Sequence, residues 1–189
     1  MASISLKYKS KQGNLTAPGD VDPGAMIPIA TVTVGSGGSS TITFSDIPQN
    51  YEHLQLRFMG RSNRSSTLDV AGLQINSTYY SKTHILNGDG STVASNTTTG
   101  LDIVAADTAN ANVFGLVIFD ILDYTNTNKN RVCRALSGFD NNGGGNAVFA
   151  SAWWDLTQAA TSLTIYPANG TLWKQYSHAA LYGIKRSGA

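Results

Sequence analysis

Along most of the chain, hydrophobic residues alternate with polar ones, as they do in β-strands that have one buried and one solvated face. The segment EHLQLRFMG shows the pattern, because Leu54, Leu56 and Phe58 are separated by the polar Gln55 and Arg57. Similar runs, rich in Thr and in β-branched or aromatic residues, predict nine or ten short strands. They lie at 29–34, 40–44, 52–60, 70–76, 79–86, 113–124, 131–139, 147–154, 163–167 and 178–186, with a further short segment at 101–106.

Other segments depart from plain alternation. VFGLVIFDILDY at 113–124 is the longest apolar run, which favours a central strand covered on both faces, with a buried helix as the alternative. DLTQAATS at 155–162 is the one helix-like stretch and allows one or two turns. NGDGS at 87–91 and DNNGGGN at 140–146 predict turns, because Asn and Gly tolerate positive φ. SNTTTG at 95–100 is expected to be a loop.

The first 28 residues differ from the rest, because Pro and Gly recur there and basic residues alternate with apolar ones. Such a segment stays extended and conformable and suits a partner's surface better than a core of its own. We therefore predict an extended N-terminal arm at 1–28 and an all-β domain at 29–189, an antiparallel β-sandwich of jelly-roll-like type. The residues of the arm expected to anchor the protein to that partner are Leu6, Lys7, Tyr8, Lys9, Lys11, Met26 and Ile27.

The overall charge excludes some classes of partner. Charged residues make up 13% of the chain, about half of the roughly 25% usual in soluble domains, and the formal net charge is +1. Without a basic cluster we expect no nucleic-acid binding. The sequence has no apolar run long enough to span a membrane and no signal peptide at its start, so we expect no membrane insertion.

Motifs for catalysis or metal binding are missing from the sequence. It contains no G-x-S-x-G, P-loop, Cys-x-x-Cys or His-Glu-x-x-His pattern. The histidines, His53, His84 and His178, fall in separate predicted strands, and we expect them to be hydrogen-bonded or exposed. Cys133 is expected to be a small buried hydrophobe. We therefore predict no enzyme activity, no catalytic residues, no metal and no cofactor.

Two carboxylates and one loop contain residue types that occur in catalytic or metal sites. Asp120 and Asp123 are three residues apart, which places them on opposite faces of a regular strand, so they are not expected to act as an acid and base pair. One of them is expected to end the strand or to pair with Arg131 or Arg134. The loop at 140–146 offers oxygen ligands but lacks the terminal carboxylate of a calcium loop, so a plain hairpin tip is expected.

Tryptophans are the candidate contact residues. Trp153 and Trp154 are adjacent in a predicted strand and must point to opposite faces, so at most one of them belongs to the core. The other is expected to contact a glycan or, more often for Trp, a neighbouring subunit. Trp173 is a further candidate for stacking on a sugar ring.

Several segments together suggest a family. GDVDPGAMIPIATVTVGSGGSSTITFSDIPQNYEHLQLR, HILNGDGST, FGLVIFDILDYTNTNKNRVCRALSGFD and HAALYGIK resemble small β-rich virion structural proteins of tailed bacteriophages. Members of this group are described as fibre or decoration proteins. The resemblance implies a location on the exterior of the virion, a homotrimer, and binding to other virion proteins such as the major capsid protein or tail and neck components. It supplies no catalytic residues.

Two functions follow from this resemblance, and a third is kept as a contrast. The first is a capsid decoration or cement protein that is anchored by its arm and stabilises the particle. The alternative is a short tail or head fibre whose sandwich binds a host surface glycan. We favour decoration, because the chain has no heptad shaft or repeat that would project a receptor-binding tip. A jelly-roll lyase or isomerase is the third class, and no motif supports it.

Overall fold

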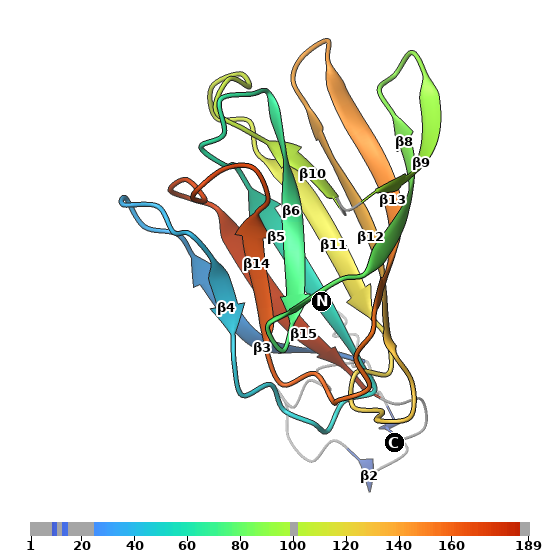
Figure 1. Cartoon of the computed structure of the whole chain (residues 1–189). Helices are drawn as coiled ribbons and strands as arrows, with labels where there is room; N and C mark the ends of the chain where they lie inside the picture. Colours follow the sequence, from blue (N-terminus) through green and yellow to red (C-terminus); the bar gives the residue numbers. More distant parts are fainter. Residues whose placement is uncertain (1–8, 11–12, 15–24, 99–101, 186–189) are drawn as a thin grey trace, which may run out of the picture.

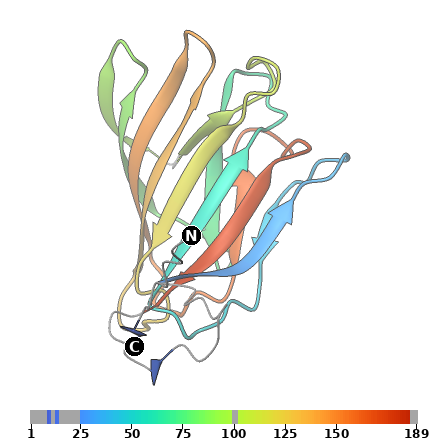
Figure 2. The ribbon, with the colours of Figure 1, turned by 180° about the vertical axis from the view of Figure 1, so that it is seen from behind.

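The computed structural model describes residues 9–10, 13–14, 25–98 and 102–185. Within these residues the chain forms fifteen β-strands and no helix. Two antiparallel sheets pack face to face as a β-sandwich (Figures 1 and 2), which confirms the predicted fold class. The jelly-roll subtype stays a prediction.

The larger sheet has eight strands and forms one complete layer of the sandwich. Its order is β3 (Met26–Thr33), β15 (His178–Ile184), β5 (His53–Gly60), β11 (Gly115–Ile121), β12 (Arg131–Asp140), β13 (Gly145–Trp154), β8 (Lys82–Gly88) and β9 (Val93–Thr98).

The smaller sheet has five strands and covers one face of the larger sheet. Its order is β10 (Asp102–Ala105), β6 (Leu68–Ile75), β14 (Leu163–Pro167) and β4 (Ile42–Phe44), and β7 (Thr78–Tyr79) pairs with β6. A separate two-stranded ladder joins β1 (Lys9–Ser10) to β2 (Gly13–Asn14).

The core lies between the two sheets and follows from the period-two pattern. Leu54, Leu56 and Phe58 of β5 point inward, as do Val117 and Phe119 of β11, and all five are fully buried. Each fully buried side chain of this size contributes about 1.5–3 kcal/mol through the hydrophobic effect. The alternation that predicted the strands therefore also orients them.

The segment 155–162 is not a helix, so that prediction is wrong. Its backbone groups are used by side chains from distant parts of the chain. The buried Arg131 donates through Nε to the carbonyl of Gln158 at 3.2 Å, and Asn76 Nδ2 donates to the carbonyl of Ala159 at 2.7 Å. Because these tertiary hydrogen bonds occupy the carbonyls that a helix would use, local helix propensity is overridden.

Two further expectations about strands need correction. The central position of the strand in 113–124 is confirmed, because β11 lies fourth in the eight-stranded sheet. Its coverage on both faces is wrong, since Leu116 is 51% exposed while Val117 is buried. The polar segment expected as a loop at 95–100 contributes its first part to the edge strand β9.

The start of the sheet falls within the segment expected to be the arm. Met26 and Ile27 belong to β3, where they pair with Ile184 and Gly183 of β15. Lys9 lies in β1, and the other proposed anchoring residues, Leu6, Lys7, Tyr8 and Lys11, lie outside the described residues. The last residues expected in the arm are therefore built into the sandwich.

Candidate functional site

The outer face of the eight-stranded sheet, which is turned toward the viewer in Figure 2, carries most of the exposed apolar surface. Of the eleven large hydrophobic side chains that are exposed in the described part of the chain, seven lie on this face within strands β5, β8, β11, β12 and β13. Each of them alternates with residues that point into the sandwich. They are Met59, Leu86, Leu116, Val132, Leu136, Phe149 and Trp153.

Strand register gathers these residues into two groups. Leu86, Phe149, Leu136 and Ile118 are direct neighbours in a row across β8, β13, β12 and β11. Leu116 and Met59, paired with each other, lie two residues further along their strands. We call these six residues the apolar band. Trp153 pairs with Val132 nearer the other end of the sheet, and we call these two the Trp153 cluster.

A polar row separates the band from the cluster. Its members are in register across five strands, from β8 to β5: His84, Ser151, Arg134, Asp120 and Gln55. Gln55 Nε2 donates a hydrogen bond to Asp120 Oδ1 at 2.9 Å. Arg134 is opposite Asp120 in register, yet its guanidinium forms no ion pair or hydrogen bond among the residues described. The row therefore places both signs of charge on one face.

The outer face is large enough for a stable protein interface. Eight strands spaced about 4.8 Å apart span about 34 Å, and six residues along a strand span about 20 Å. The face therefore measures about 700 Å² in projection, close to the roughly 800 Å² that each partner buries in a standard interface. Monomeric proteins seldom expose apolar patches beyond a few hundred Å².

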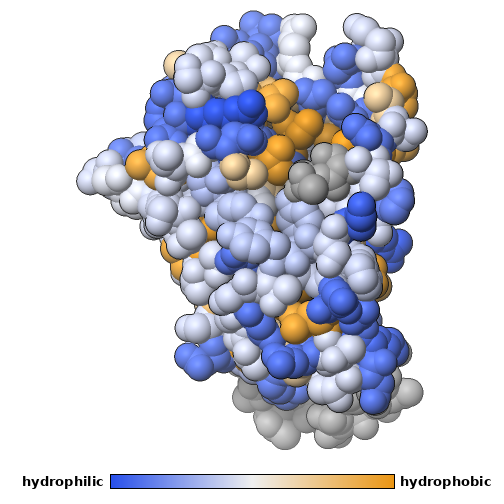
Figure 3. All heavy atoms as spheres, viewed as in Figure 1, coloured by the Kyte–Doolittle hydropathy of each residue, from blue (hydrophilic) through white to orange (hydrophobic). Residues whose placement is uncertain are grey.

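The opposite side of the sandwich provides a contrast. Figure 3 shows the face formed by the five-stranded sheet. This face is mostly hydrophilic or neutral, and its apolar surface is divided into small separate areas. On that sheet Thr43 and Thr164 share a hydrogen bond of 3.0 Å on the solvent side. The apolar band and the Trp153 cluster therefore have no counterpart on the face seen in Figure 3.

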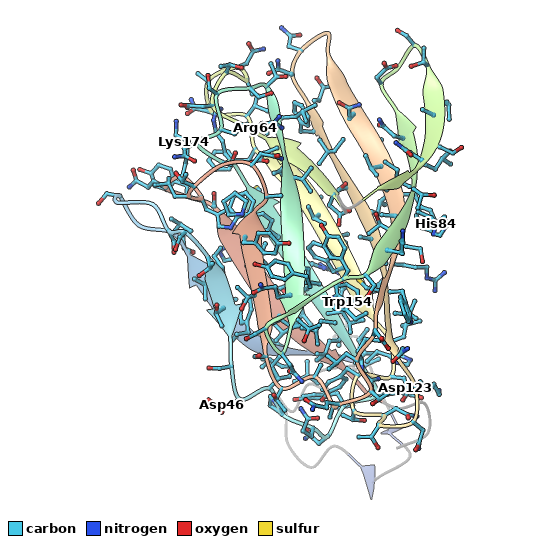
Figure 4. The ribbon with its side chains drawn as sticks, in the orientation of Figure 1. Asp46, Arg64, His84, Asp123, Trp154 and Lys174 are labelled. Carbon is cyan, nitrogen blue, oxygen red and sulfur yellow. The ribbon has the colours of Figure 1, made fainter. Side chains whose placement is uncertain are left out.

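The predicted division of the tryptophans is confirmed. Trp154 is 0% exposed and lies between the sheets (Figure 4), where its Nε1 donates to the carbonyl of Thr78 at 3.2 Å. Trp153 points outward and is 38% exposed. Trp173 is fully buried and packs edge-on against Phe58, with ring centroids 4.7 Å apart, so it offers no surface to a sugar.

Trp153 and the loop at 140–146 do not form one site. The loop is the tip of the β12–β13 hairpin, as predicted, and Asn142 and Gly143 have positive φ there. Trp153 lies eight residues along β13 from Gly145, which corresponds to about 26 Å. A single monosaccharide cannot contact both.

The histidines and aspartates are dispersed. His53 Nδ1 accepts a hydrogen bond from the backbone N–H of Asp123 at 2.9 Å, and His178 Nδ1 is 2.8 Å from Thr33 Oγ1. His84 is exposed on the polar row (Figure 4). Across the described ranges, no three His, Cys, Asp or Glu side chains are grouped so that they could hold a metal ion.

Asp120 and Asp123 lie in different structural settings. Asp120 belongs to β11, and Asp123 follows the strand in a turn with φ of 52°. The Asp123 carboxylate pairs with Lys129 at 2.6 Å, and its main-chain carbonyl accepts a hydrogen bond from Arg131 Nη1 at 2.6 Å. The ammonium of Lys129 lowers the pKa of Asp123. Asp123 therefore stabilises a turn.

Two ionisable groups in the core have strongly shifted pKa values. Burial raises the pKa of the Cys133 thiol, which is fully enclosed as predicted. Burial likewise raises the pKa of Asp102 well above its ordinary value, and the nearby Ser137 hydroxyl offsets this only in part. Neither carboxylate oxygen of Asp102 meets a hydrogen-bond donor in good geometry. Both groups are enclosed between the sheets, away from the outer face.

Sequence reasoning identified Trp153 but missed the apolar band. The signal was present in RVCRALSGF, where Val132 and Leu136 alternate with Cys133 and Ala135, so that both faces of the strand are apolar. The same holds for Leu116 beside Val117 in β11. Apolar residues on both faces predict burial on both faces, and the described chain covers only one.

In the part of the chain that the structure describes, no helix has the length and apolar character needed to cross a membrane. Comparisons with protein-family models, with curated proteins and with solved structures find no match.

Proposed function

We propose that the protein is a virion structural protein of a tailed bacteriophage, a capsid decoration or cement protein whose copies assemble through the outer face of the eight-stranded sheet. The observation that supports this proposal is that the apolar band and the Trp153 cluster both lie on the same solvated sheet face. The phage setting rests on the sequence resemblance. In this function the protein acts by burying surface, and no reaction is required.

A second copy of the chain is the partner that fits the outer face best. Its area is close to what one partner of a standard interface buries. The unpaired Arg134 of one copy can reach Asp120 of a neighbour, so the polar row is complementary to itself in charge. The resemblance implies three copies, and in a ring of three each copy uses one part of this face toward one neighbour and a different part toward the other.

The proposed attachment to the particle uses the N-terminal arm. Because β3 begins at Met26 and is paired with β15, the proposed arm consists of the residues before Met26. The partners proposed from the resemblance are the major capsid protein or tail and neck components. The protein then lies on the exterior of the particle, with the sandwich outside and the arm against the shell.

Assembly can be tested with the full chain in solution. Leu136→Glu places a carboxylate in the middle of the apolar band, so the wild-type trimer should become a monomer in sedimentation or light-scattering measurements. Thr43→Glu on the outer face of the other sheet is the matched control and should leave the trimer intact. A wild-type protein that is monomeric at high concentration would contradict the proposed interface.

Attachment requires a separate experiment. Removal of residues 1–24 leaves β3 intact and should abolish rebinding to particles stripped of the protein, while the trimer persists. Imaging of intact particles should then show a few hundred copies on the shell. A few dozen copies at the tail or at one vertex would favour the fibre function instead.

The fibre alternative has weaker support from the geometry. In that alternative one of Trp153 and Trp154, together with loops such as that at 140–146, lies at the glycan contact, and Trp153 is about 26 Å along β13 from this loop. Trp153 also adjoins Val132 on a sheet face, where a flat apolar surface suits a protein partner.

A further inference from the structure

We propose that a pocket at one end of the sandwich, separate from the outer sheet face, binds a saccharide. Its volume is about 510 Å³, within the range of small-molecule sites. The residues that carry the argument are Arg61, Asp107, Asn112, Phe114, Lys174 and Tyr176, and we call it the Tyr176 pocket.

The pocket lies at the end of the sandwich remote from the start of β3. Lys174 and Asp123 mark opposite ends of the molecule in Figure 4. Tyr176 precedes β15, whereas Met26 pairs with Ile184 at the far end of that strand, which is six residues and about 20 Å from the strand's first residue, His178. A particle attached through the N-terminal arm would therefore present this pocket outward.

Arg61 makes the pocket rigid. Its side chain is buried, and its two terminal nitrogens donate to four carbonyls of a single loop, those of Asp107, Ala109, Asn110 and Val113, at 2.7–3.1 Å. Because the loop is fixed before any ligand arrives, binding would cost little conformational entropy.

One polar group of Arg61 is left without a partner. Arg61 Nε is buried and makes no hydrogen bond in the described structure. A buried donor without an acceptor is costly, so the four hydrogen bonds of the terminal nitrogens must hold this side chain in place. Arg61 itself is 8% exposed, so this donor belongs to a well-enclosed side chain.

The rim of the pocket presents an aromatic ring on unusual backbone. Tyr176 is 66% exposed and has φ of 72°, and Asn112, also in the lining, has φ of 62°. Positive φ is uncommon for a bulky residue such as Tyr and is found where surrounding structure enforces it, often at binding sites. Here the N–H of Tyr176 is held by the carbonyl of Val34 at 3.0 Å.

The chemistry of the lining matches a sugar. The Tyr176 ring, with Phe114 nearby, offers an apolar face for the C–H groups of a pyranose. Asp107 and Lys174 form an ion pair that remains partly exposed, so it can accept and donate hydrogen bonds to hydroxyls without adding net charge. Asn112 and Gln175 supply amides that are exposed and make no side-chain hydrogen bond among the residues described.

Binding can be measured on the full chain by nuclear magnetic resonance. Backbone amide shifts would be followed while glucose, galactose, mannose, rhamnose and N-acetylglucosamine are each added to millimolar concentrations. We expect at least one sugar to shift the amides of Asn112, Gln175 and Tyr176. Tyr176→Ala should weaken this binding about tenfold by removing the stacking surface, and Tyr176→Phe should retain it.

Tyr79→Ala is the matched control, because it removes an exposed tyrosine ring on β7, in the other sheet and outside the lining of the Tyr176 pocket, and should leave sugar binding unchanged. Well-dispersed amide spectra of each variant would show that it is folded. The proposal is overturned if no sugar of the panel shifts the pocket amides, or if Tyr176→Ala binds as well as the wild type. A monomer that still binds sugar would contradict only the proposed assembly, and a trimer that binds none would contradict only this site.

Discussion

The buried carboxyl of Asp102 should make the stability of the protein depend on pH in an unusual direction. Asp102 lies in β10 with 1% of its surface exposed, and neither carboxyl oxygen meets a hydrogen-bond donor in good geometry. Burial disfavours the charged form, so the folded-state pKa is well above the ordinary value of 3.8. Folding therefore favours the protonated carboxyl.

The magnitude follows from proton linkage. Stability from this group is fully present below the unfolded-state pKa of 3.8. As the pH rises above that value, the free energy of unfolding decreases by about 1.4 kcal/mol per pH unit, and it levels off once the pH passes the folded-state pKa. Asp107 and Asp123 have lowered pKa values, so their contributions are lost as the pH falls below the ordinary value, in a separate window.

Asp102→Asn removes the titration and keeps the shape of the side chain. The free energy of unfolding would be measured by urea denaturation between about pH 4 and pH 8. We expect the difference between the variant and the wild type to shift in favour of the variant as the pH rises. Asp46→Asn, which changes an exposed carboxylate, is the control and should run parallel to the wild type. Parallel curves for wild type and Asp102→Asn would refute the conclusion that folding keeps this carboxyl protonated.

Three other substitutions test the packing and are measured by the same urea titration. Trp154→Ala should lower the free energy of unfolding by about 3–5 kcal/mol, because it leaves a cavity between the sheets. Trp153→Ala should change the stability of the monomer by less than about 1 kcal/mol. Equal losses would contradict the opposite orientations of the two side chains. Arg131→Met should lower the free energy of unfolding by about 3 kcal/mol, since it leaves the carbonyls of Asp123 and Gln158 without this donor. An unchanged stability would show that the loop at 155–162 keeps its conformation without Arg131. Gly115→Ala should cost about 1–3 kcal/mol, because the new Cβ would lie 2.5 Å from the Val104 Cα, and a neutral effect would mean that β10 can move away from β11.

Most of the strands could be predicted from the sequence because their pattern is local. The alternation of Leu54, Leu56 and Phe58 with polar residues fixes both a strand and its orientation, and the same logic placed Trp153 and Trp154 on opposite faces. Edge strand β9 escaped prediction, since its polar residues are exposed on both sides and give no such signal. The pattern fails where a strand has no buried face.

The loop at 155–162 and the Tyr176 pocket could not be predicted, for a different reason. Each depends on a buried arginine whose partners are far away in the sequence: Arg131 for the loop and Arg61 for the pocket. Composition predicts that such a side chain is exposed, because arginine is seldom buried without partners. Only the fold brings the carbonyls to the guanidinium.

The mistaken prediction for β11 gives the strongest argument for assembly. An apolar run such as that containing Leu116, Val117 and Ile118 predicts burial on both faces, and the residues that the structure describes bury only the face that bears Val117. The neighbouring β12 shows the same excess, with Leu136 57% exposed opposite Phe149 at 49%. Residues of this kind on a solvated sheet promote uncontrolled association unless a specific partner covers them. A second copy bound through the outer face would supply the missing coverage, so the burial that the sequence predicts for a strand would be completed by another chain.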